Sequence, residues 1–398
     1  MKALLLENIH PAAVETLEAR GYDVELRAGS LSEDELIAAL SEGVQLLGIR
    51  SNTTVTKRVL DESPGLLAIG CFCIGTNQVD LVTAAEKGVG VFNAPYSNTR
   101  SVVELVIAEL IALARRLPEK TQRMHEGTWD KSAKGSHEVR GRTLGIVGYG
   151  NIGTQLSTVA EALGLNVVFY DTADRPAHGT ARRMRSLKDL LAVADVVSLH
   201  VDGRPGNAGF FGAAEFAAMK PRALFLNASR GMVVDYEALR DNLISGHIAG
   251  AAVDVFPAEP KAQGDAFDSV LRGLDNVILT PHIGGSTQEA QEEIGWFVAE
   301  KLARFALEGS TALSVNLPAV LPPELPAGHR IGLLHRNLPG VLAELNATFA
   351  TAGDNVVDQH LATKDGLGYV VTDAAAPLSA EAIETLSKAE YCMWVRTW

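Results

Sequence analysis

The feature that most constrains the fold of this chain is the glycine pattern Gly148-x-Gly150-x-x-Gly153. It follows a short apolar run and opens a segment with apolar residues at helical spacing, which stops at Gly164. A second apolar run then ends in Asp171. Strand, glycine turn, helix, strand and acid in this order predict a βαβ unit that binds a dinucleotide.

Each residue of this pattern has a physical role in such a unit. Gly148 permits the tight turn, Gly150 lets the backbone approach the pyrophosphate, and Gly153 lets the helix pack closely on the strand. The N–H groups at the start of the helix then face the phosphates. Asp171 lies 18 residues beyond Gly153, close to the usual spacing of about 20 for the acid that binds a ribose 2′-hydroxyl. A carboxylate there repels a 2′-phosphate, so the sequence favours NAD over NADP. The alternative is a glycine-rich turn in some other α/β protein.

Composition limits the classes of partner. The chain has 398 residues, which predicts two or three domains, and its 47% hydrophobic and 21% charged residues are ordinary for a globular protein. The net charge of −13 argues against nucleic acid or an anionic membrane as a partner. Any anionic substrate must therefore be bound by local basic residues.

Cysteines and apolar runs give no sign of a disulfide framework, a metal site or a membrane span. Cys71 and Cys73 lie in one apolar run and Cys392 stands apart, without a His or Cys cluster, so we expect core cysteines and no metal. The longest apolar stretch, 102–113, is too short and too charged to cross a membrane. We see no signal peptide and expect a cytoplasmic protein.

Residues 1 to about 97 alternate apolar runs with helical patterns, which predicts a parallel α/β sheet without a glycine-rich phosphate loop. The predicted strands are 2–6, 45–49, 66–71 and 89–92, and the predicted helices are 12–20, 32–41 and 80–87. A long apolar helix is expected over 98–117, ending near Pro118. The strands of the cofactor domain are then expected near 167–170, 195–201, 223–227, 251–256 and 276–280, and a second long helix over 287–307 returns to the first domain.

The last part of the chain has a pattern of its own. Residues 313–326 carry four prolines and predict a stiff linker. Beyond it, the order strand, helix, strand, strand, helix, strand predicts a βαββαβ, ferredoxin-like unit. The whole chain is then α/β. A substrate domain of flavodoxin-like type spans 1–98 and 287–312, and a Rossmann-type NAD domain spans 99–286. A linker over 313–328 leads to the small unit at 329–398.

Three predicted strand ends carry residues that suit the chemistry of the cofactor. Hydride transfer from an alcohol requires a base for the hydroxyl proton and a cation for a carboxylate and the forming carbonyl. Arg230, Glu259 and His282 follow successive strands, where the carboxyl edge of a parallel sheet places its ligands. Arg230 can bind a carboxylate through two hydrogen bonds, His282 can move the proton, and Glu259 can orient the ring. The alternatives are a surface Arg, a solvated Glu and a structural His.

Six long motifs resemble the D-3-phosphoglycerate dehydrogenases of the D-isomer-specific 2-hydroxyacid dehydrogenase family, in their bacterial form with a C-terminal ACT domain. They cover residues 69–80, 92–102, 148–154, 227–231, 254–260 and 279–291. The resemblance extends over nearly the whole chain. It implies NAD-dependent oxidation of D-3-phosphoglycerate to 3-phosphohydroxypyruvate, the first step of phosphorylated L-serine biosynthesis, by a homotetramer.

The resemblance also implies roles for single residues. Arg230, Glu259 and His282 match the catalytic Arg, Glu and His of the family. Besides the glycines, the implied cofactor contacts are Asn151, Ile152, Asp171, Ala228, Ser229, Arg230, Asp254, His282, Ile283, Gly284 and Gly285. The implied substrate contacts are Arg50, Ser51, Asn98, Lys131 and Gln291. Trp129 and Lys131 match a segment that reaches a neighbouring subunit in the family, although Trp129 could also be a simple core aromatic. Closure of the two α/β domains would exclude water from the transfer.

The ferredoxin-like unit resembles an ACT regulatory domain. His335, Asn337 and Asn355 match the residues that hold L-serine across a domain dimer, which implies feedback inhibition by serine. The alternative is that these residues only cap a turn.

Two departures and three alternatives accompany the resemblance. The first-domain motif often reads Arg-Ser-Arg, but here Asn52 takes the last position, so one cation for the phosphate is missing. The usual Gly-Gly hinge before the ACT domain reads Ala327-Gly328. Members of the family can also reduce 2-oxoglutarate to 2-hydroxyglutarate. The chain could instead be another D-2-hydroxyacid dehydrogenase, or a nucleotide-sensing protein without turnover, which the intact trio argues against.

Overall fold

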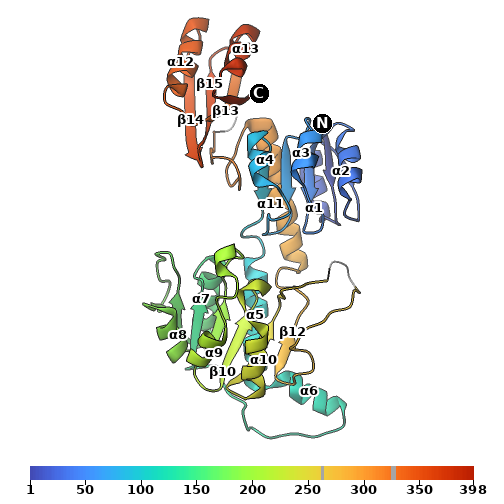
Figure 1. Ribbon diagram of the computed structural model, residues 1–398, viewed down its shortest axis with the longest axis vertical. Coiled ribbons are helices and arrows are strands. Elements are labelled where there is room, and N and C mark those ends of the chain that lie inside the picture. The colour runs from blue at the N-terminus through green and yellow to red at the C-terminus, as the bar shows by residue number, and fades with distance from the viewer. Residues whose placement is uncertain (261–263, 324–328) are drawn as a thin grey trace. The chain divides into compact units, whose positions relative to one another are not determined.

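The computed structural model describes residues 1–260, 264–323 and 329–398, and these divide into two compact units (Figure 1). Unit 1 comprises residues 1–97 and 291–398, and unit 2 comprises residues 98–290. The expected hinge Ala327-Gly328 and the end of the expected linker lie outside the described residues.

The first part of unit 1 is a parallel α/β sheet, as predicted. Its strands run in the order β2-β1-β3-β4-β5, all parallel. They are β1 (Lys2–Leu5), β2 (Asp23–Leu26), β3 (Val44–Ile49), β4 (Ala68–Cys71) and β5 (Gly90–Asn93). The helices are α1 (Pro11–Ala19), α2 (Glu33–Leu40), α3 (Lys57–Glu62), α4 (Leu81–Glu86) and the long α11 (Gln288–Glu308). Successive strand residues enter two different cores, so the sheet is covered on both faces.

The second part of unit 1 has the predicted βαββαβ order. It comprises β13 (His329–Arg336), α12 (Val341–Ala352), β14 (Val356–Lys364), β15 (Leu367–Ala374), α13 (Ala380–Lys388) and β16 (Cys392–Thr397). The antiparallel sheet has the order β14-β15-β13-β16. One face packs on α12 and α13, and Leu334, Tyr369 and Val371 of the other face join the core around α1 and α11.

Unit 2 is a doubly wound sheet of seven strands in the order β12-β11-β10-β9-β6-β7-β8, all parallel. The strands are β6 (Thr143–Val147), β7 (Asn166–Tyr170), β8 (Arg182–Arg183), β9 (Val196–Leu199), β10 (Ala223–Asn227), β11 (Ile248–Val253) and β12 (Val277–Leu279). One face packs on α5 (Thr99–Arg115) and α7 (Asn151–Ala162), and the other on α8 (Leu187–Val193), α9 (Ala213–Ala218) and α10 (Tyr236–Ile244). Two 3₁₀ turns, η1 (Pro205–Asn207) and η2 (Gly231–Val233), complete the unit.

The long helix expected over 98–117 is shorter in the structure. It ends at Arg115 because Arg116 adopts a left-handed conformation, with φ of 55°. A separate helix, α6 (Leu117–His125), then begins with Pro118 in its first turn. The proline was expected to mark the end of one helix, but it opens the next, where its missing N–H costs nothing.

Candidate active site

The glycine turn of unit 2 is shaped for a close ligand. Gly148 has a φ of 92°, and a Cβ there would lie 2.4 Å from the carbonyl oxygen of His200. A Cβ at Gly153 would lie 2.3 Å from the carbonyl oxygen of Gly148, so helix and turn pack as predicted. A Cβ at Gly150 would meet nothing within 4 Å, and Gly150 precedes α7 without a side-chain cap. The first N–H groups of the helix are thus open toward a phosphate.

Asp171 lies directly beside this turn, at the end of β7. One carboxylate oxygen accepts a hydrogen bond from the N–H of Tyr149 at 2.7 Å, and the other accepts one from the N–H of Ala173 at 2.8 Å. The acid is therefore fixed next to the phosphate turn, where a ribose is expected. Turn, open helix start and acid together fit a dinucleotide with a free 2′-hydroxyl.

His282 and Glu259 form a hydrogen-bonded pair, with 2.8 Å between Nδ1 and Oε2. The hydrogen bond to Glu259 raises the pKa of His282 against the opposing effect of burial, and the charges of Glu259 and Asp254 add to the rise. Burial alone would raise the pKa of Glu259. The hydrogen bonds from His282 and from the Phe256 N–H outweigh it, so that the pKa of Glu259 is lowered. Nδ1 of the ring faces the carboxylate, which leaves Nε2 as the atom that can exchange a proton with a substrate.

Arg230 is held by the loop that follows β10. The Asn227 amide donates to the carbonyl oxygen of Arg230 at 3.3 Å, and its own oxygen accepts from the hydroxyl of Ser229 at 2.7 Å. The Tyr236 hydroxyl donates to the carbonyl oxygen of Val255 at 2.6 Å and lies 3.1 Å from the Asn227 amide. Buried Asn227 and Tyr236 therefore connect the loop of Arg230 to the loop that carries Glu259.

Gly231 allows these two loops to touch. A Cβ at this position would lie 2.0 Å from the carbonyl carbon of Phe256 and 2.5 Å from the nitrogen of Pro257. Only a residue without a side chain permits this approach. The positions of Arg230 and Glu259 are thus coupled through direct backbone contact.

Asp254 organises the loop that carries His282. Its side chain is buried and accepts hydrogen bonds from the Thr280 hydroxyl at 2.6 Å and from the N–H groups of Ile283 at 2.8 Å and Gly284 at 2.9 Å. The N–H of His282 donates to the backbone oxygen of Asp254 at 2.8 Å, which holds a left-handed φ of 53° at the histidine. The structure thus joins Asp254, His282, Ile283 and Gly284 in one loop cluster.

Comparison with known proteins decides the family. The family model described as "D-isomer specific 2-hydroxyacid dehydrogenase, NAD binding domain" matches residues 107–284. A D-3-phosphoglycerate dehydrogenase of Escherichia coli (strain K12) is 51% identical over 94% of this chain and 92% of its own length. The chain belongs to the D-isomer specific 2-hydroxyacid dehydrogenase family. It is an oxidoreductase, and its cofactor is NAD.

Solved structures share the fold of this dehydrogenase. A protein of Thermus thermophilus superposes with a TM-score of 0.70 at 34% identity, covering 78% of this chain and 97% of its own. A D-lactate dehydrogenase from Aquifex aeolicus, solved with NAD and lactic acid, gives a TM-score of 0.67 at 25% identity, covering 80% of this chain and all of its own (100%).

The remaining predicted contacts of the dehydrogenase come from both units. In unit 2, Asn98 precedes α5, and its amide nitrogen would lie 2.4 Å from a Cβ at Gly285. Lys131 and Trp129 are exposed, and Trp129 at 78% exposure is not a core aromatic. In unit 1, Gln291 lies on α11.

Arg50 and Ser51 follow β3 on a loop that a buried acid holds. The carboxylate of Glu7 accepts hydrogen bonds from the N–H groups of Arg50 at 3.2 Å, Asn52 at 2.9 Å and Thr53 at 2.8 Å. Sequence reasoning missed Glu7, although an acid that ends the first apolar run of the chain could have signalled it. Because the loop is fixed by its backbone, the change at Asn52 alters a side chain and not the support of the loop.

The three predicted effector residues differ in exposure. His335 is buried, its Nδ1 lies 2.8 Å from the carbonyl oxygen of Arg336, and a Cβ at Gly368 would lie 2.2 Å from its ring. Asn337 and Asn355 are exposed. His335 therefore contributes to the packing of the domain and is also a candidate contact for serine.

Three expectations concerned metal sites, membrane spans and cysteines. In the part of the chain that the structure describes, no group of three or more His, Cys, Asp or Glu side chains could hold a metal ion. Among the same residues, no helix is long and apolar enough to cross a membrane. Cys71 is buried as expected, but Cys73 and Cys392 are only partly buried. The thiol of Cys73 donates to the carbonyl oxygen of Gly75 at 3.2 Å.

Proposed function

We propose that this dehydrogenase oxidises D-3-phosphoglycerate to 3-phosphohydroxypyruvate with NAD, the first step of phosphorylated L-serine biosynthesis. The observation that carries the proposal is the His282–Glu259 pair beside the loop of Arg230. The name of the Escherichia coli relative, at 51% identity over nearly the full length, supports the choice of substrate.

The proposed chemistry balances with these residues alone and the cofactor. When bound at the glycine turn and Asp171, NAD would supply the acceptor for the hydride of the substrate's C2. Nε2 of neutral His282 takes the hydroxyl proton as the C2–O bond becomes a carbonyl. Glu259 at Nδ1 stabilises the imidazolium that results, and the guanidinium of Arg230 binds the carboxylate and the carbonyl oxygen.

Further substrate contacts are proposed for residues on both units. Arg50, Ser51 and Gln291 lie on unit 1, and Asn98 and Lys131 lie on unit 2. The cations among them suit the phosphate and carboxylate of the substrate. Because Asn52 replaces a possible third cation, an unphosphorylated 2-hydroxyacid is the second candidate substrate, and reduction of 2-oxoglutarate is a proposed side activity.

Regulation and assembly are proposals as well. We infer that the C-terminal βαββαβ unit is an ACT domain, and that L-serine binds it at Asn337, Asn355 and His335 and inhibits turnover. We also propose a homotetramer with a cytoplasmic location.

The direct test is NADH formation from D-3-phosphoglycerate and NAD, with and without L-serine. Turnover that serine suppresses supports substrate and regulation together. Turnover that ignores serine contradicts the regulatory proposal alone. If phosphoglycerate gives no turnover while NADH reduces 2-oxoglutarate, the substrate assignment is wrong and the dehydrogenase assignment stands. His282→Ala should abolish turnover in either case, and near-normal turnover in this variant would contradict the role of the histidine.

A further inference from the structure

A large cavity lies at the opposite edge of the unit 2 sheet from the catalytic loops. It has a volume of about 590 Å³. Arg142, Asp195, Arg222 and Asn276 line it, and each immediately precedes a strand, β6, β9, β10 or β12. Since the amino ends of parallel strands share one edge, this cavity is separate from Arg230, Glu259 and His282, which follow the carboxyl ends.

The acids in the wall of this cavity are already neutralised. Glu119 forms ion pairs with Arg116 at 2.5 Å and with Arg123 at 2.7 Å. Asp130 pairs with Arg123 at 3.1 Å and accepts the N–H of Ser132 at 2.9 Å. These carboxylates offer little to a cationic ligand.

The third acid of the wall, Asp195, is neutralised in the same way. It pairs with Lys220 at 2.5 Å and accepts the N–H of Thr143 at 2.9 Å. None of the three acids therefore needs a cation from outside.

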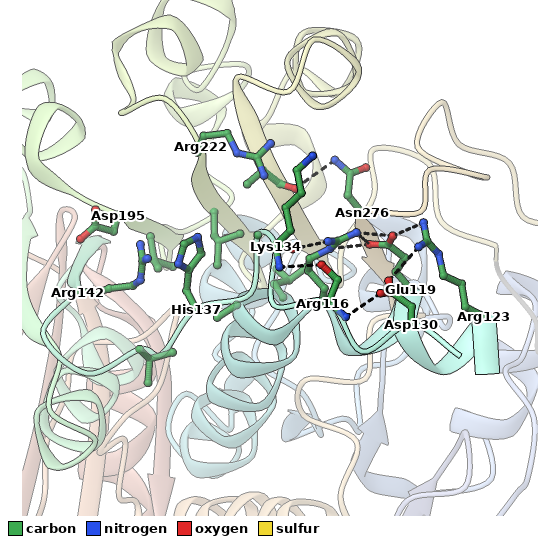
Figure 2. A pocket seen from close by; sticks show the side chains of 18 residues that line it. Arg116, Glu119, Arg123, Asp130, Lys134, His137, Arg142, Asp195, Arg222 and Asn276 are labelled. Atoms are coloured by element: carbon green, nitrogen blue, oxygen red, sulfur yellow. Dashed lines mark hydrogen bonds and ion pairs between the residues drawn. The ribbon is translucent and has the colours of Figure 1, made fainter. Parts of the chain in front are cut away.

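Three cations of the wall have charge to spare. Among the described residues, Lys134, Arg142 and Arg222 have no carboxylate within ion-pair distance, and Arg142 donates only to the carbonyl oxygen of Glu138, at 3.0 Å. In Figure 2, Arg222, Lys134 and Arg116 gather on one side of the cavity. The cavity therefore carries an excess of positive charge in a chain whose net charge is −13.

Gly135 marks the point where two guanidinium groups converge. A Cβ on Gly135 would lie 3.6 Å from Nη1 of Arg116 and 3.9 Å from Nη2 of Arg222. The absence of a side chain leaves room for a ligand atom between the two forks. Glu119 already holds Arg116, so Arg222 and the ammonium of Lys134 are the donors that remain for phosphate oxygens, through charge-assisted hydrogen bonds.

The floor of the cavity is apolar, formed by Leu113, Val196 and Leu224. An inorganic ion takes up about as much space as a few water molecules of about 30 Å³ each. The cavity is therefore larger than one such ion requires. We propose that the cavity binds a small organic phosphate, with Arg222 and Lys134 on the phosphate and the apolar floor under the organic part.

The alternative of an ordinary solvated surface makes a different prediction. Exposed arginines that face only water bind anions weakly and without preference for position. A built site instead depends on Arg222 and Lys134 individually, because each supplies a charge-assisted hydrogen bond to the same ligand.

The test uses the full chain and inorganic pyrophosphate as the probe. The protein is first saturated with NADH, so that the dinucleotide site is occupied, and binding is then measured by isothermal titration calorimetry. We expect one pyrophosphate per chain. We expect Arg222→Gln and Lys134→Gln each to weaken binding about tenfold, since each removes one charged hydrogen bond. The matched control is Arg182→Gln, an exposed arginine of β8, which should bind as the unaltered chain does.

The outcomes separate the proposal from its alternatives. No binding to the NADH-saturated chain, or equal loss in Arg222→Gln and Arg182→Gln, would overturn it. An effect that NaCl of matched ionic strength reproduces is general screening and would overturn it too. If Arg222→Gln fails to fold, Lys134→Gln on an exposed loop decides the question. Phosphoglycerate turnover of the same preparations is a separate readout, so failure of the proposed function is distinguished from failure of this site.

Discussion

The Nδ1 atom of His282 lies 2.8 Å from Oε2 of Glu259, and this pair sets the protonation of the histidine. The carboxylate raises the pKa of His282, so protonated imidazole persists to higher pH than in an ordinary histidine. Only the neutral ring can accept the hydroxyl proton. If His282 is the proposed base, Glu259 orients its ring and shifts to higher pH the range in which the ring is neutral.

The first prediction concerns the acid limb of the pH profile, the range in which kcat/KM falls as His282 becomes protonated. This limb should lie at higher pH than an ordinary histidine would give. kcat/KM for alcohol oxidation should fall as pH drops through the raised pKa of His282, and should level off above it. In Glu259→Gln the charge is gone, the pKa of His282 falls, and the limb should move to lower pH. The value of kcat/KM at high pH should drop by about tenfold or more, because the imidazolium loses the carboxylate that stabilises it. Initial rates between pH 5 and pH 10 give both values, with exposed Glu237→Gln as the control. A limb that stays in place in Glu259→Gln would contradict the role of the pair.

Gly231 gives a second prediction. A methyl group in Gly231→Ala would lie 2.0 Å from the carbonyl carbon of Phe256, so the loops of Arg230 and Glu259 must separate. We expect kcat/KM to fall about a hundredfold, since small displacements of catalytic groups carry costs of this order. Gly65→Ala is the control, because a Cβ there would meet nothing within 4 Å. Equal activity in the two variants would show that the loop contact does not position the site.

Cofactor choice gives a third prediction. The carboxylate of Asp171 is fixed by the N–H groups of Tyr149 and Ala173 and should repel a 2′-phosphate. Asp171→Ala should raise KM for NAD about tenfold and make turnover with NADP measurable. Kinetics with both cofactors test this, with Asp174→Ala as the control, since Asp174 is exposed and pairs with Arg183. An unchanged ratio of NAD to NADP efficiency would remove Asp171 from the specificity argument.

Local sequence was sufficient to place the loops of Arg230, Glu259 and His282, because each residue follows a strand within a few positions. The glycine turn and Asp171 were predictable for the same reason. The hydrogen bonds of Glu7 and the cavity lined by Arg222 could not be predicted. The residues that form them are distant in sequence and meet only when parallel strands align their ends. The edge strand β2 was also missed. Two of its four residues are exposed and two are partly buried, and they form no apolar run.

A fourth prediction concerns Glu109, an acid inside α5 that is only 5% exposed. Burial, with the nearby charge of Asp254, raises its pKa to about 8. Between the ordinary value of 4.5 and about 8, the unfolded chain releases this proton while the folded chain keeps it. The free energy of unfolding should therefore decrease with rising pH, by up to about 1.4 kcal/mol per pH unit.

Glu109→Gln should flatten this dependence, because the amide does not titrate. Urea midpoints between pH 5 and pH 8 provide the measurement. Glu104→Gln, an exposed change on the same helix, is the control and should keep the slope of the unaltered chain. Parallel slopes for Glu109→Gln and the unaltered chain would mean that Glu109 titrates as in the unfolded state.

The last prediction concerns a buried ion pair that anchors the C-terminal sheet. Arg330 is 1% exposed and binds both carboxylate oxygens of Asp373, at 2.6 and 2.7 Å. Its remaining donors reach the carbonyl oxygens of Glu308, at the end of α11, and Pro323, each at 3.0 Å. Arg330→Ala leaves Asp373 buried without its partner, which should cost about 3–5 kcal/mol of unfolding free energy.

A double variant separates charge from packing at this anchor. In Arg330→Met with Asp373→Leu, no uncompensated charge is left, so much of the lost stability should return. Arg336→Ala, exposed at the end of the same strand, is the control and should change the melting temperature little. If Arg330→Ala were as stable as Arg336→Ala, the pair would not hold the sheet. If the double variant were as unstable as the single one, the hydrogen bonds to Glu308 and Pro323 would be the main contribution, because both variants lose them.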